Sequence, residues 1–119
     1  MSIEMVGYGL SALGAFPLLA SGAMFILHHP TIVQNMTHLN FEVGQMRALG
    51  LAKIAIAILT LIPATSFVGV ILATGWMGGA IAAHLRVHDQ FVIQTMVPIL
   101  IWIGFGLRHV NEMRQLLNV

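Results

Sequence analysis

Cysteine is absent from this 119-residue chain, and charged side chains are scarce. Without cysteine there can be no disulfide, no thiolate metal site and no thiol nucleophile. Charged residues make up 8% of the sequence, whereas soluble domains carry roughly 25%. The five basic residues are scattered singly and the net charge is +1, so no basic surface exists for gripping nucleic-acid phosphates. We therefore exclude thiol chemistry and nucleic-acid binding.

The motifs of independent catalysis are missing as well. The sequence contains no phosphate-binding glycine loop, no nucleophile–base pair and no pair of neighbouring carboxylates. By itself it assigns the chain no reaction.

Apolar residues dominate instead, at 58% of the sequence with a mean hydropathy of +0.91. Such a chain cannot cover itself with a water-facing surface, so lipid must be its solvent, and we expect one membrane domain over residues 1–119. Apolar runs predict four membrane-spanning helices, at about residues 6–27, 43–62, 67–85 and 91–107.

The connections between these runs predict how the helices are arranged. The turns at 63–66 and 87–90 are short, which favours antiparallel neighbours, whereas the mostly polar segment 28–42 is the longest water-exposed connection. Residues 108–117 alternate apolar and polar side chains, as a helix lying on a membrane surface does. The predicted fold is all-α: an integral membrane antiparallel four-helix bundle with a C-terminal amphipathic surface helix.

Small residues recur along the third apolar run. Gly75, Gly79 and Ala83 are spaced every fourth residue, which places three nearly bare backbone positions on one helical face. We expect this face to be the helix-packing surface, and the third helix to lie at the centre of the bundle.

Histidines gather at the end of the same run. His84 and His88 are four residues apart, a spacing at which two imidazoles on one helix can share a metal ion. The alternative is that they are ordinary interfacial rings, half in an apolar and half in a wet region. No carboxylate–histidine motif supports a metal, so the two remain weak candidates and we assign none.

Lys53 is the unexpected charge, since it lies six residues beyond Arg47 and therefore deeper in the second apolar run. It shares a helical stripe with Gly50, Ala57 and Thr60, which favours an ammonium that faces the bundle. The alternative is a long side chain that bends back to the lipid headgroups.

The segment 72–87, Leu-Ala-Thr-Gly-Trp-Met-Gly-Gly-Ala-Ile-Ala-Ala-His-Leu-Arg-Val, resembles the most typical stretch of the DoxX-like family of small membrane proteins. Other pieces agree with that family in order and spacing: Leu49-Gly50, Leu61-Ile62-Pro63, and Trp102 followed by Gly104, Gly106, Leu107 and Arg108. The chain departs from the family pattern at Lys53, where an acidic residue is expected, and at Ala64, where arginine is expected.

The resemblance implies a four-helix membrane bundle, usually with cytoplasmic termini, in a family whose members are linked with quinone-reducing or redox-stress complexes or have no assigned role. We accordingly expect a small integral subunit or accessory protein of a quinone-linked oxidoreductase or electron-transfer complex, in a bacterial inner membrane. The alternative is a non-redox structural or assembly protein that packs between partner subunits and lipids. In both cases its partners are membrane lipids and other membrane subunits, or a second copy.

A quinone is the cofactor that these residues suit best; a haem, for which only His84 is suitably placed, ranks below a metal ion. A quinone site needs an apolar cleft, a donor for each carbonyl and a route for protons. His84 and Arg86 beside the glycine face would supply the donors, and His88 would exchange protons near neutral pH. Lys53 is a further candidate for binding the cofactor.

Overall fold

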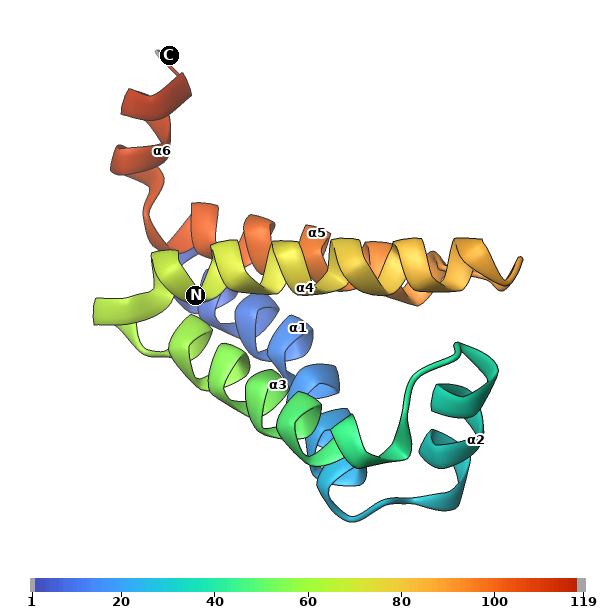
Figure 1. Cartoon of the computed structure of the whole chain (residues 1–119). Coiled ribbons are helices and arrows are strands. Elements are labelled where there is room, and N and C mark those ends of the chain that lie inside the picture. Colours follow the sequence, from blue (N-terminus) through green and yellow to red (C-terminus); the bar gives the residue numbers. More distant parts are fainter. Residues whose placement is uncertain (1, 118–119) are drawn as a thin grey trace.

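The computed structural model describes residues 2–117, which form helices and no strand (Figure 1). The helices are α1 (Ile3–Ile26), α2 (Pro30–His38), α3 (Met46–Leu61), α4 (Ser66–Arg86), α5 (Val92–Arg108) and α6 (Val110–Leu117). Two 3₁₀ turns, η1 (Val43–Gln45) and η2 (Pro63–Thr65), precede α3 and α4. The all-α prediction is confirmed, and the bounds of the four long helices lie within three residues of the expected ones.

Proline and capping side chains explain several helix ends. The Ser2 hydroxyl accepts a hydrogen bond from the Met5 amide at 3.2 Å and so caps α1. Pro30 occupies the first turn of α2, where its missing amide hydrogen is not needed, and Pro63 opens η2 where α3 has ended. The segment expected to be a long connection therefore contains a helix, because Pro30 starts one.

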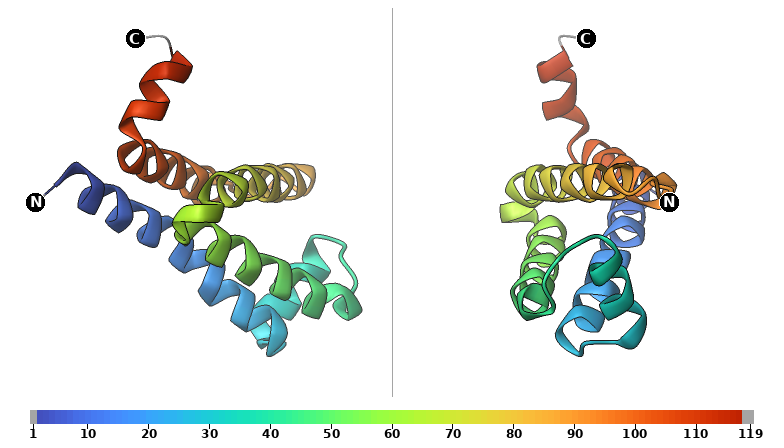
Figure 2. Two further views of the ribbon diagram at one scale, coloured as in Figure 1. Left: turned by 90° about the vertical axis from the view of Figure 1, so that its left-hand side faces the viewer. Right: turned by 45° about the vertical axis from the view of Figure 1, so that its right-hand side comes forward.

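The four long helices form two pairs, α1 with α3 and α4 with α5, which diverge from each other at one end (Figure 1). α1 lies against α3 and α5, and α4 lies against the same two helices (Figures 1 and 2). Figure 1 shows α1 and α3 close to α4 and α5 near the connection η2, and apart from them near α2. The prediction that the third long helix is central is wrong, because α1 and not α4 has the most extensive packing.

Glycines allow the close helix contacts, but they are not the ones that the spacing suggested. Gly22 of α1 and Gly50 of α3 face each other, so that a Cβ on Gly50 would lie 2.6 Å from the Gly22 carbonyl oxygen. Gly7 and Gly104 do the same between α1 and α5, where a Cβ on Gly104 would lie 2.8 Å from the Gly7 carbonyl oxygen. Close approach requires small residues on both helices.

The prediction that Gly75 and Gly79 are helix-packing positions therefore has to be corrected. A Cβ on either would meet no atom within 4 Å, and both residues line a cavity together with Ala83. The reason is that the space beside them is this cavity, so no neighbouring helix approaches them closely. α4 instead makes its closest approach at Gly69, where a Cβ would overlap the backbone of Thr60.

Two segments of the described chain, Ile3–Ile26 and Pro63–Arg86, are long and apolar enough to cross a membrane by themselves. α5 and α6 reach that threshold only together, and the chain bends by 104° between them. α3 has 16 residues, about a turn short of a typical span. The protein is an integral membrane protein; by length and composition the described residues offer two candidate spans, or three if α5 and α6 count as one, where the sequence predicts four. Figure 1 shows α6 pointing away from the other helices.

An arginine joins three of the helices at the end far from α2. Arg108 of α5 is 7% exposed, and its guanidinium donates to the Ser11 hydroxyl of α1 at 3.2 Å and to the Thr60 carbonyl of α3 at 3.0 Å. A further bond of 3.5 Å reaches the Leu61 carbonyl, and the Tyr8 ring lies 4.2 Å from the guanidinium carbon. Arg108 thus supplies donors to carbonyls that the end of α3 leaves without helical partners.

Candidate functional site

A cavity of about 520 Å³ lies where the two helix pairs diverge, and it is partly open to the outside. Residues of α1, α3, α4 and α5 form its walls, and α2 contributes Met36. The walls are mostly apolar, with Leu18, Phe25, Trp76, Met77 and Val97 among them. Four polar side chains line it as well: Ser21, Lys53, His84 and Gln94. Its volume falls in the range of small-molecule sites in proteins.

Lys53 is the one charged side chain of the cavity lining. Its ammonium donates to the Ser21 hydroxyl at 3.0 Å and lies 4.2 Å from the centroid of the Phe25 ring and 6.0 Å from that of Trp76. The Lys53 side chain therefore faces the bundle and does not bend back to the lipid headgroups. Within residues 2–117 no carboxylate pairs with Lys53, so an ammonium with donor capacity to spare lies among aromatic rings.

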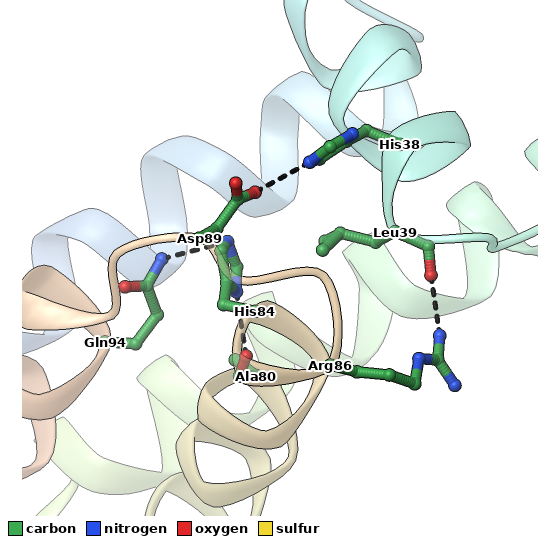
Figure 3. A network of polar contacts seen from close by, with 7 residues as sticks. All are labelled: His38, Leu39, Ala80, His84, Arg86, Asp89 and Gln94. Carbon is green, nitrogen blue, oxygen red and sulfur yellow. Dashed lines mark hydrogen bonds and ion pairs between the residues drawn. The ribbon is translucent and has the colours of Figure 1, made fainter.

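His84 lines the same cavity from the last turns of α4. Its Nδ1 lies 2.8 Å from the Ala80 carbonyl oxygen, and its Nε2 lies 3.4 Å from the amide nitrogen of Gln94 on α5 (Figure 3). The imidazole is therefore held by one contact from its own helix and one from the neighbouring helix.

Arg86 and His88 do not reach the cavity. The Arg86 guanidinium donates to the Leu39 carbonyl at 2.8 Å, just beyond α2 (Figure 3). α4 ends at Arg86, so His88 lies beyond the helix and does not continue the helical face of His84. Across the described residues no group of three metal-ligating side chains occurs.

A closing motif explains why α4 stops there. The Asp89 amide bonds back to the His84 carbonyl at 2.8 Å and the His88 amide to the Leu85 carbonyl at 3.1 Å, with His88 in the left-handed region at φ 62°. This is the Schellman arrangement, which usually uses glycine. Since histidine occupies the left-handed position here, the sequence carries no glycine to signal the end of the helix.

α2 covers one side of the cavity, and we did not predict this helix from the sequence. Met36 and Leu39 are buried and line the cavity. Besides the Arg86 bond, an ion pair of 3.0 Å joins His38 to Asp89, so two polar contacts tie the α2 segment to the end of α4 (Figure 3). A proline at the first helical position was the available signal for α2.

The site can hold an apolar molecule with a polar head, because apolar walls surround a donor at Lys53 and a histidine–amide pair at His84 and Gln94.

The sequence profile of the DoxX-like family matches residues 9–105, which include every residue that lines the cavity. Neither the curated proteins nor the solved structures gave a match. The family profile covers well over half of the sequence, and the chain therefore belongs to the DoxX-like family.

Proposed function

We propose that this protein is a small integral subunit or accessory protein of a quinone-linked oxidoreductase complex, and that its cavity holds the quinone ring. The observation that carries the proposal is the cavity itself: about 520 Å³ of mostly apolar space with one charged donor, Lys53, inside it. A quinone combines a flat apolar ring, carbonyl acceptors and an apolar tail, and each part has a counterpart here.

The ring would lie beside the aromatic side chains of Phe25 and Trp76, next to which the Lys53 ammonium is already placed. One carbonyl would accept a hydrogen bond from Lys53, which uses one of its three donors on Ser21. The tail would leave through the open side of the cavity towards lipid. Electrons would come from a partner subunit.

In the membrane, we propose that α1, α3, α4 and α5 all cross and form an antiparallel bundle, with η1 extending α3 by most of a turn. α6 would lie on the surface, since the chain bends by 104° before it. Both termini would face the cytoplasm of a bacterial cell, and lipids, other subunits or a second copy would cover the exposed apolar faces.

Tryptophan fluorescence offers a direct test, because the chain has two tryptophans and one of them, Trp76, lines the cavity. In a Trp102→Phe background, a short-chain benzoquinone should quench Trp76 fluorescence in a saturable way. Lys53→Met should weaken this binding about tenfold, the value of one hydrogen bond from a charged donor. The matched control is Arg47→Met, which removes an exposed cation of the same helix outside the cavity.

Quenching that rises linearly with quinone, as it does for free tryptophan, would contradict the proposal. Gentle detergent extraction and mass spectrometry would then decide about the other candidate. Stable co-purification with membrane subunits, without any quinone binding, would favour the structural or assembly protein.

A further inference from the structure

The hydrogen bonds of His84 indicate the role of each of its two ring nitrogens. The Ala80 carbonyl oxygen, 2.8 Å from Nδ1, can only accept, so Nδ1 carries a proton. At Nε2 the partner is the Gln94 amide nitrogen, which is a donor, at 3.4 Å. In a neutral imidazole with its proton on Nδ1, Nε2 is an acceptor, and the Gln94 amide can donate to it.

This assignment gives the two polar ends of the cavity opposite character. The ammonium of Lys53 has only donors to offer. The His84 end offers an acceptor, Nε2, directly beside a donor, the Gln94 amide, and both residues line the cavity. The bond between them is long, so a ligand oxygen that inserts there displaces little.

A hydroxyl group fits the His84–Gln94 pair and a carbonyl group does not. A hydroxyl donates its hydrogen to His84 Nε2 and accepts from the Gln94 amide, so it satisfies both. A carbonyl oxygen accepts from Gln94 but presents a lone pair to the lone pair of Nε2. Sites built to bond a substrate hydroxyl reject analogues that lack it, because their polar groups are left unpaired.

We infer that the cavity is selective for the redox state of its ligand, binding the hydroxyl-bearing quinol in preference to the quinone, and that His84 determines the preference. This inference rests on the proposed function. At Lys53 both forms have an oxygen that can accept, so that end does not discriminate.

The other charged groups near this end do not enter the argument. Arg86 is bonded to the Leu39 carbonyl, and His38 and Asp89 pair with each other, so that none of these three side chains faces the ligand space (Figure 3).

The test compares the affinity of the two redox forms for the full chain in detergent. Isothermal titration under argon would use a decyl-substituted benzoquinone and the corresponding quinol. We expect the quinol to bind about tenfold more tightly, the value of one matched hydrogen bond in place of an acceptor–acceptor contact.

Three variants assign the effect to a residue. His84→Phe keeps a ring and removes the acceptor, so the preference for quinol should vanish. His84→Gln covers the case in which phenylalanine does not fold, because a rotating amide can donate or accept and should bind both forms alike. Lys53→Met, the control, should weaken both forms by the same factor and keep their ratio.

The outcomes separate the inference from the proposed function. If neither form binds, the quinone cavity itself is wrong and the inference falls with it. If both bind equally well, or the quinone binds more tightly, only the redox preference is refuted. A preference for quinol that persists in both His84 variants would overturn the assignment to His84.

Discussion

Arg108 gives the sharpest prediction about what holds this fold together. Arg108→Met keeps most of the side-chain volume and removes the guanidinium that bridges Ser11 of α1 and the Thr60 carbonyl of α3. The carbonyls of Thr60 and Leu61 then lose this donor in a place that water scarcely reaches, because Arg108 is 7% exposed. We expect a folded but less stable protein.

The size of the effect follows from the two shorter bonds, at 3.0 and 3.2 Å. A hydrogen bond from a charged donor contributes about 1.5–3 kcal/mol, so the two together contribute about 3–6 kcal/mol. Methionine also removes the cost of burying the guanidinium, and side-chain bonds in membrane proteins are weaker on average, so we expect a loss of about 2–4 kcal/mol. Both bonds start at one guanidinium nitrogen, Nη1, and a lysine ammonium has three donors, so Arg108→Lys should lose less stability than Arg108→Met.

Unfolding in mixed micelles of detergent and sodium dodecyl sulfate, followed by circular dichroism, would measure these losses. The control is Arg114→Met, which removes an exposed arginine from α6 and should leave the transition where it is. An Arg108→Met protein that unfolds together with the wild type would refute the reasoning. It would mean that the free energy gained from the buried hydrogen bonds only offsets the cost of burying the charge.

Three further predictions test other parts of the structure. Gly50→Ala should lower the stability by roughly 1–3 kcal/mol, because its Cβ would lie 2.6 Å from a carbonyl oxygen of α1. The control, Gly79→Ala, should leave the stability unchanged, because its Cβ would meet no atom within 4 Å. Gly79→Leu, in contrast, should fold and lose quinone binding, because its side chain would fill the cavity; wild-type affinity in this variant would contradict the cavity. Arg86→Ala should loosen α2, because it removes the bond to the Leu39 carbonyl. A cysteine placed at the buried position of Met36 should then react several-fold faster with a water-soluble maleimide. An unchanged rate would show that this bond does not hold α2 in place.

Several features of this protein could be predicted from its sequence because they depend on short stretches of chain. Hydropathy adds up along a segment, so the membrane class and the approximate bounds of the long helices follow from composition and from prolines such as Pro63. The family could be recognised for the same reason, since the segment 72–87 carries its pattern in consecutive residues. Lys53 could be singled out because a charge in an apolar run is rare.

Tertiary structure alone decided which of these residues meet. Gly75 and Gly79 have the spacing of packing residues, yet the close contacts form at Gly22 and Gly50, because close approach depends on what the opposing helix presents. The tautomer of His84 likewise depends on Gln94 of another helix as well as on Ala80 of its own. A cavity exists only where two helix pairs diverge, and periodicity within one segment carries no information about that angle.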